Sequence, residues 1–413
     1  MFNRIVKSII AAFYGQGVTL LFQFISVPLF ISAWGMEYYG QWLAIFAIPM
    51  TLTILDFGFF NIIGNKISKN IIEYDYSKAS NIINVVFRYI FFAFLMFSFF
   101  VLFVYLISDY KDKFSLFFIL MLYSFLVLLT NFIVNVFRAN LEFHVGSFLS
   151  NTSRLIESII VLISLYFDAN MFDVSVAYLS SRLVSVIGIW FYFNKKFTWY
   201  SFKIERNYTI NINDIKDSIN YAFLPIAFML NNQGAIFVIN SIFGSVQVAV
   251  FVTIRTYFRL LNQGVSALTN ATWQEINYLY NVQKWMDLNR LMNKVILIVF
   301  VFSILIGIGL FIFINPVLDF WTHKEIISSV NINLLILMSV MFFSFWQPFH
   351  IFLSAIGKHK THAKIYFLLQ VFVLSFSYFF LSKFIDFLFA VVTIELIMLI
   401  SINIIYKKNQ HVI

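Results

Sequence analysis

The chain has 413 residues, of which 61% are hydrophobic and 11% are charged, with a formal net charge of +9 and no cysteine. Soluble domains carry about 25% charged residues, so this composition predicts an integral membrane protein. The lack of cysteine excludes disulfides, thiol catalysis and thiolate-bound metal.

The first apolar run follows a short basic segment, MFNRIVKS, and reaches Ile31. A secretory signal has an apolar core of about 7–15 residues followed by a small-residue cleavage site, and this segment has neither feature. We therefore expect a first membrane-spanning helix rather than a cleaved leader.

About 20 apolar residues are needed to span a bilayer as a helix. On this rule the sequence predicts twelve spans, over residues 8–31, 41–61, 83–107, 114–137, 149–167, 173–193, 218–240, 245–268, 294–314, 329–355, 364–381 and 384–405. The alternating segments of about 10 residues that form membrane β-barrels are not seen. The predicted fold class is an all-α integral membrane protein.

Basic residues fall mainly in the loops on one side of these spans. Of the 28 lysines and arginines, 21 lie in loops on the side of the N-terminus, four lie in loops on the other side, and three lie within spans. Loops rich in lysine and arginine stay in the cytoplasm, so we expect both termini there. The net charge then reflects topology, and nucleic acid is not an expected partner.

The longest interruption of the apolar pattern, residues 194–217, is basic and falls at the middle of the chain. It predicts two six-helix lobes, residues 1–206 and 207–413. Each lobe opens with a span that ends at an aromatic–glycine pair, Trp34-Gly35 and Phe243-Gly244. An amphipathic segment follows the second span of each lobe, over residues 65–81 and 272–292. These features predict parallel repeats, related by a pseudo-two-fold axis along the membrane normal, with a site between them.

Two arginines, Arg255 and Arg259, lie in the middle of the eighth span. An arginine at this depth costs roughly 2.5–3.5 kcal/mol on insertion scales, and such residues usually face a bundle interior or a wet cavity. Their i, i+4 spacing places them on one helix face. They are candidate substrate-binding residues, and the alternative is a structural ion pair with Glu395.

Three further charged residues are predicted within spans. Arg182 lies midway along the sixth span, where it either faces a cavity or pairs with Asp56 or Glu157. Asp56 and Glu395 are candidates for ion coupling, with helix packing or an arginine partner as the alternative.

Side-chain amides gather in the first, seventh and eighth spans. Such groups often bond across helices in lipid, but together they also suit a hydrated cavity that binds sugar hydroxyls. The candidate substrate-binding amides are Gln16, Gln23, Asn231, Asn232 and Asn262.

Enzyme signatures are not found. His359 and His362 lie in a basic loop, and no acidic residue that could complete a metal site is nearby. Gly357-Lys358 lacks the upstream glycine of a phosphate-binding loop. We expect a protein that is not an enzyme and that uses neither a metal nor a cofactor.

At several points the sequence resembles the Wzx-type polysaccharide flippases of the MOP superfamily. The resemblance lies at the entry to the second span, at its exit, and after the tenth span, in Gly15, Pro28-Leu29, Gly35, Tyr39-Gly40-Gln41-Trp42, Leu55-Asp56-Phe57-Gly58-Phe59, Asn61, Lys66 and Ala355-Ile356-Gly357-Lys358. It extends over the whole chain as twelve helices with a middle linker.

The resemblance implies a MATE-like pair of six-helix bundles, with helices 1, 2, 7 and 8 lining a cavity. It also implies a function: a flippase for undecaprenyl-pyrophosphate-linked oligosaccharides in O-antigen or capsule synthesis. Such a protein acts in the bacterial cytoplasmic membrane, beside a polysaccharide polymerase and a chain-length regulator, and we expect a monomer. In this interpretation Arg255 and Arg259 hold the pyrophosphate.

Two alternatives are open at this point. A MATE-like exporter of drugs or organic ions shares the fold, but the arginines argue against a cationic substrate. A membrane-embedded glycan polymerase or ligase usually needs a large external loop, and the predicted external loops are short.

Overall fold

The computed structural model describes residues 2–54, 59–107, 114–202, 222–326 and 328–410. Its contacts divide the chain into two units. Unit 1 contains residues 1–34 and 45–225, and unit 2 contains residues 35–44 and 226–413. The predicted lobe boundary, between residues 206 and 207, lies outside the described residues.

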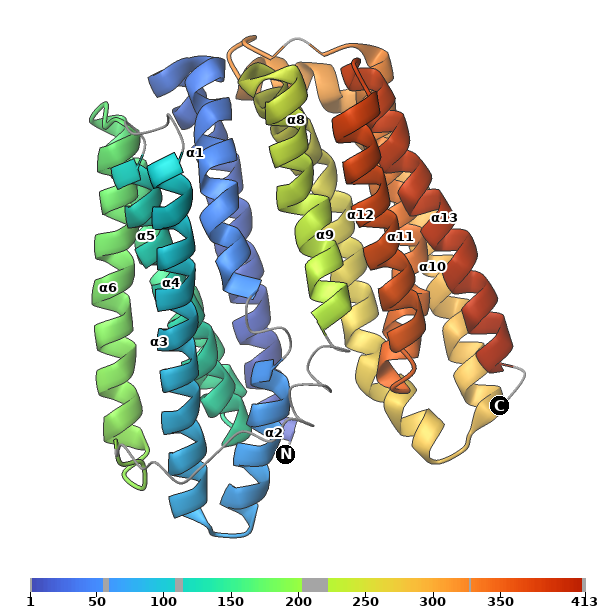
Figure 1. Cartoon of the computed structure of the whole chain (residues 1–413). Coiled ribbons are helices and arrows are strands. Elements are labelled where there is room, and N and C mark those ends of the chain that lie inside the picture. Colours follow the sequence, from blue (N-terminus) through green and yellow to red (C-terminus); the bar gives the residue numbers. More distant parts are fainter. Residues whose placement is uncertain (1, 55–58, 108–113, 203–221, 327, 411–413) are drawn as a thin grey trace. The chain divides into compact units, whose positions relative to one another are not determined.

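Unit 1 is a bundle of long helices that run side by side (Figure 1). Helix α4 packs against α3, α5 and α6, and the short helix α2 packs against α3 and α4. The elements are α1 (Phe2–Thr51), the 3-10 turn η1 (Leu52–Ile54), α2 (Phe59–Ile72), α3 (Tyr76–Ile107), α4 (Phe114–Ala139), α5 (Phe143–Tyr166) and α6 (Met171–Lys196).

Helix α1 contains the first predicted span and only part of the second. It is broken at Gly35, where φ is 74° and ψ is 169°. The second span was predicted to reach residue 61, and this is wrong: the α-helix ends at Thr51, two residues after Pro49. Proline has no N–H to continue the helical ladder, which favours an end nearby. The amphipathic segment predicted over residues 65–81 is likewise divided, into the end of α2 and the start of α3.

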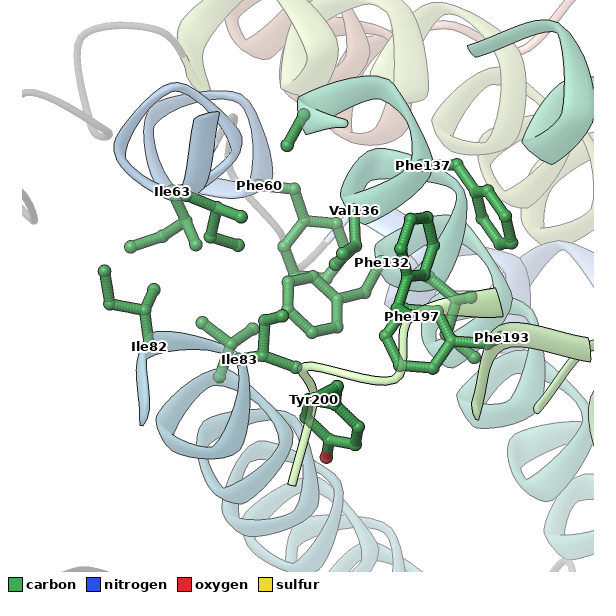
Figure 2. Packing of buried hydrophobic residues seen from close by; sticks show 14 of the residues in the cluster. Phe60, Ile63, Ile82, Ile83, Phe132, Val136, Phe137, Phe193, Phe197 and Tyr200 are labelled. Carbon is green, nitrogen blue, oxygen red and sulfur yellow. The ribbon is translucent and has the colours of Figure 1, made fainter. Parts of the chain in front are cut away.

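An aromatic and aliphatic cluster joins α2, α3, α4 and α6 (Figure 2). Phe60 of α2 packs on Phe132 of α4 with ring centroids 5.1 Å apart. The segment after α6 folds back onto the same cluster, because Tyr200 is buried there and its hydroxyl donates to Asn84 Oδ1 of α3 at 2.8 Å. Asn84 also donates to the carbonyl of Ser201. This end of unit 1 is therefore held by packing and by hydrogen bonds together.

Unit 2 is organised around α11, which packs against α9, α10 and α13. The helix that enters unit 2 is described from residue 222 onward and contains a π-helical turn. The elements are the helical residues 222–229, the π-helix η3 (Leu230–Gly234), α8 (Ala235–Phe243), α9 (Ser245–Asn281), α10 (Trp285–Trp321), α11 (Val330–Ala355), α12 (Lys360–Phe380) and α13 (Phe384–Gln410). The amphipathic segment predicted over residues 272–292 is divided into the end of α9 and the start of α10.

The two units share the backbone geometry of their first turn. Gly35 directly follows the first span, which lies in unit 1, and Gly244, with φ 88° and ψ 170°, ends the first span of unit 2. This region of φ and ψ is open essentially to glycine alone. The aromatic–glycine pairs noted in the sequence therefore mark equivalent chain reversals.

Two later turns match in the same way. Tyr74, after α2, and Gln283, after α9, both take left-handed conformations, with φ of 59° and 58°. In each turn this residue and the next one donate the paired backbone hydrogen bonds of a Schellman motif, which satisfy the last carbonyls of the helix. The turn at Leu141, between α4 and α5, matches the turn at Gly357, between α11 and α12, with the same hydrogen bonds. These matches support the predicted repeat.

Within the described residues, ten helical stretches are long and apolar enough to cross a membrane. One of them, Phe13–Thr51, includes most of the first predicted span and the first part of the second. The predicted span at 245–268, which lies in α9, is not among the ten. Helix α9 is long enough to cross, but its interior carries arginines and amides. The chain is thus a multi-pass membrane protein with one unusually polar helix.

Candidate functional site

A buried polar network lies in the middle of unit 2. At its centre is Glu395 of α13, which is 2% exposed. Its Oε1 accepts hydrogen bonds from Asn231 Nδ2 at 2.7 Å and from the Tyr366 hydroxyl at 2.8 Å, and its Oε2 accepts from Trp346 Nε1 at 2.8 Å. Three donors converge on one carboxyl group, an arrangement that stabilises the ionised carboxylate. The network joins α11, α12, α13 and η3.

The π-helix η3 presents Asn231 to this network. In η3 the backbone N–H of Ala235 bonds to the carbonyl of Leu230, five residues earlier. Such turns insert an extra residue into a helix and are frequent at functional sites. Asn231 donates to Glu395 and to the Tyr366 hydroxyl, and it accepts from Arg255 through both its backbone carbonyl and its side-chain oxygen. Asn231 therefore connects the carboxylate to the guanidinium.

Arg255 and Arg259 extend the network along one face of α9. Arg255 also lies over the ring of Phe251, 5.3 Å from its centroid. One turn on, Arg259 Nη2 donates to Asn232 Oδ1 at 3.1 Å. In the part of the chain that the structure describes, no salt bridge includes either arginine. Two positive charges therefore face neutral amide oxygens, and Asn231 separates Arg255 from the carboxyl group of Glu395.

The predicted alternative for Arg255, a direct ion pair with Glu395, is not what the structure shows. Asn231 lies between the two groups and hydrogen-bonds to both. A neutral amide transmits only part of the electrostatic stabilisation that a contact pair provides, since a hydrogen bond between charged groups is roughly twice as strong as one between neutral groups. The guanidinium of Arg255 can therefore form a stronger hydrogen bond with a charged acceptor than it forms with this neutral amide.

Asn262, the next predicted site residue on α9, accepts a hydrogen bond from the Ser344 hydroxyl of α11. Six of the predicted site residues thus lie in unit 2, in contacts that join neighbouring helices. They are Asn231, Asn232, Arg255, Arg259, Asn262 and Glu395.

Arg182 of α6 has a different environment, in unit 1. Its Nη2 lies 2.6 Å from Glu157 Oε2 in a buried salt bridge. The Tyr123 hydroxyl donates to Glu157 Oε1 at 2.7 Å, and the Tyr123 ring lies beneath the guanidinium, 5.6 Å from Cζ to centroid. The predicted structural pair with Glu157 is confirmed. Arg182 is thereby compensated by a full opposite charge, unlike the arginines of α9.

The remaining predicted residues lie on the second span or on α1. Asp56 is outside the described residues. Gln16 is exposed on α1, and Gln23 is half-buried two turns further along the same helix. Both glutamines belong to unit 1, whereas the network lies in unit 2.

Sequence reasoning missed Tyr366, Trp346 and Ser344. The chain has 21 tyrosines and eight tryptophans, so no single aromatic residue stands out. A usable signal was the need of a buried glutamate for donors from other helices, since buried charges are normally hydrogen-bonded. The sequence does not say which helix provides them.

Comparisons with known proteins identify the architecture. No protein-family model and no curated protein sequence matches the chain. Solved structures do match over almost its full length. An inward-facing multidrug resistance MATE family transporter of the MOP superfamily aligns with a TM-score of 0.68 and 16% identity, covering 95% of each chain.

Two further matches have comparable coverage. An outward-facing MATE transporter of the MOP superfamily aligns with a TM-score of 0.60 at 16% identity, covering 99% of this chain and 96% of that one. A MOP superfamily transporter from Pyrococcus furiosus, described as having a binding pocket of reversed polarity, aligns with a TM-score of 0.62 at 14% identity, covering 99% and 95%.

The chain has the fold of the MOP superfamily transporters. At these identities the likeness establishes the MOP fold and not the substrate. The predicted fold class is confirmed, and the site described above lies within the second unit of that fold.

Proposed function

We propose that the chain is a flippase that moves undecaprenyl-pyrophosphate-linked oligosaccharides from the cytoplasmic to the outer leaflet of a bacterial cytoplasmic membrane by alternating access. The observation that carries this proposal is the pair Arg255 and Arg259, which in the described part of unit 2 contact amide oxygens rather than a carboxylate. An anionic head group is the ligand that such a pair lacks.

The physical chemistry of the cargo fits this pair. A pyrophosphate cannot cross hydrocarbon unaided, because burying an unpaired charge is very costly. A guanidinium fork matches phosphate oxygens in geometry and remains charged at any relevant pH. Outward movement of negative charge is also favoured by an inside-negative potential, by about 2.3 kcal/mol per charge per 100 mV.

The neighbours of this fold support a transport cycle. Both inward-facing and outward-facing structures are known among MATE transporters that align with the chain. The Pyrococcus furiosus transporter is described as having a pocket of reversed polarity that suggests a different function, so proteins with this fold need not share one function. Transport is therefore preferred to the alternative of glycan polymerisation or ligation.

A MATE-like multidrug or organic-ion exporter is the second candidate. It is favoured by the description of two aligned structures as multidrug resistance transporters. An organic cation would require a carboxylate that is free to bind it. In unit 2, Glu395 already accepts three hydrogen bonds from buried donors, so we rank this candidate lower.

The decisive experiment replaces both arginines of α9 with glutamine, which keeps side-chain length and polarity and removes the charge. Each charged hydrogen bond contributes roughly 1.5–3 kcal/mol, so the double variant should lose on the order of a hundredfold or more in affinity for undecaprenyl pyrophosphate. Surface glycan should fall in flippase-deficient cells that express the variant at the wild-type level.

Arg154→Gln is the matched control, because Arg154 is an exposed arginine of unit 1. It should leave both binding and export unchanged. If the double variant exports glycan normally at equal protein level, the arginines do not hold the head group. Drug efflux that survives in the double variant, without lipid binding in the wild type, would favour the exporter.

Partners follow from the proposed reaction. The flipped product is a substrate for a polysaccharide polymerase acting with a chain-length regulator, and we propose a functional monomer. The roles of Asp56 and Glu395 in ion coupling remain predictions.

A further inference from the structure

The polar face of α9 continues beyond its arginines. Arg255, Arg259, Asn262 and Ser266 follow one another at spacings of three or four residues, which places them on one side of the helix. In the predicted orientation α9 runs toward the cytoplasm, so Asn262 and Ser266 lie on the cytoplasmic side of the arginines.

Helix α11 meets this face with two polar side chains three residues apart. The Ser344 hydroxyl donates to Asn262 Oδ1. Gln347 Nε2 donates to the Ser266 hydroxyl at 2.7 Å. These two pairs form successive polar contacts between helices that are otherwise packed closely.

The second contact leaves an acceptor unused. Gln347 Oε1 is buried and, within the described part of the chain, has no hydrogen-bond partner. A buried polar atom left unsatisfied costs about 1–3 kcal/mol. Asn262 uses only its oxygen in the first contact, so its NH2 group is a further donor, one turn of α9 before Ser266, the residue that Gln347 contacts.

We infer that Asn262 and Gln347 form a carbohydrate subsite that binds the first sugars of the cargo, an inference that rests on the flippase proposed above. Sugar hydroxyls, like that of serine, both donate and accept, and so can satisfy Gln347 Oε1 and the Asn262 amide. From Arg259 to Ser266 the helix rises about 10 Å, which is about the length of two sugar units.

A purely structural role for these contacts makes a different prediction. Polar side chains commonly join helices in membranes, contributing about 0.6 kcal/mol on average. If Gln347 served only that purpose, its loss would weaken every ligand to the same extent. A subsite instead changes the preference for cargo that carries sugar.

The experiment measures the affinity of the purified full-length protein for two probes, undecaprenyl pyrophosphate and undecaprenyl-pyrophosphoryl N-acetylglucosamine. The wild type should bind the sugar-linked probe more tightly. Gln347→Leu should reduce that preference about tenfold while binding of the sugar-free probe stays unchanged, as expected for the loss of one hydrogen bond. Ser266→Ala, a smaller change, should act in the same direction.

Gln247→Leu, at a half-buried glutamine near the start of α9, is the matched control and should not alter the preference. Equal wild-type affinity for the two probes, or an equal loss of both in Gln347→Leu, overturns the subsite and leaves the flippase intact. If the wild type binds neither probe, the flippase proposal itself fails.

Discussion

Replacing Glu395 with glutamine tests the network of unit 2 most directly. Glutamine has nearly the same shape, so Oε1 can still accept from Asn231 and Tyr366. At the position of Oε2, however, an NH2 group now faces the Trp346 Nε1–H, which donates there in the wild type. Two donors then oppose each other in a site that excludes water.

The magnitude follows from the hydrogen bond that is lost. A bond to a charged acceptor contributes about 1.5–3 kcal/mol, and a buried donor without a partner costs about 1–3 kcal/mol. The lost hydrogen bond and the unpaired donor are partly the same loss, so the two figures do not add in full. We expect Glu395→Gln to lower the free energy of unfolding by about 2–4 kcal/mol. Glu275→Gln, at an exposed glutamate of α9, should change it little.

A double-mutant cycle makes the prediction specific. Trp346→Phe removes the opposing donor, so it should destabilise the wild type but be neutral or stabilising in the Glu395→Gln background. The expected coupling energy lies at about 0.5–3 kcal/mol, as for residues in one hydrogen-bond network. The measurement is reversible SDS-induced unfolding in mixed micelles, followed by far-ultraviolet circular dichroism. Equal effects of Trp346→Phe in both backgrounds would refute the proposed geometry.

Three further predictions concern single features of the fold. Arg182→Leu should cost about 3–5 kcal/mol because it leaves a buried carboxylate unpaired, whereas replacing both members of the pair with leucine should restore much of the stability in the same unfolding assay. At Gly40 an added Cβ would lie 1.8 Å from the backbone oxygen of Ser245, so Gly40→Ala should reduce the yield of folded protein. Gly17→Ala, with open space at its Cβ, should not. Hydrogen bonds from the Lys78 side chain and backbone lower the pKa of Asp75 below its usual 3.8. The stabilising effect of Asp75 is therefore present at neutral pH and lost as the pH falls through that lowered pKa, and a pH titration of unfolding should show this loss in the wild type but not in Asp75→Asn.

The sequence singled out Arg182 in unit 1 and Arg255 and Arg259 in unit 2 because charged residues are rare within membrane spans. The partner of Arg182 was also among the predictions, since few carboxylates lie within spans. The partner of Arg255 was not found, because the contact passes through a backbone carbonyl and an amide that depend on the π-helical turn of η3. The secondary-structure propensities of the residues do not predict such a π-helical turn.

Helix ends were less predictable than helix centres. Hydropathy defines where a chain is apolar, but the ends at Thr51 and Asn281 depend on local backbone geometry. The left-handed residues Tyr74 and Gln283 are not glycine, so the turns that they form carry no clear sequence signal. Only the comparison of the two units revealed them as a pair.

The length of helix α9 has a consequence for the motion of its C-terminal end. It is a single helix from Ser245 to Asn281, about 55 Å long, and Arg255 lies about 39 Å from its C-terminal end. For each tilt of about 10° around the arginine, that end moves by about 7 Å. Asn277 Nδ2 holds the carbonyl of Ala355 at the end of α11, so α11 would share the displacement. A small tilt at the arginines thus becomes a large displacement at the helix end, and in a chain with no cysteine a single label introduced at Asn281 would report on it.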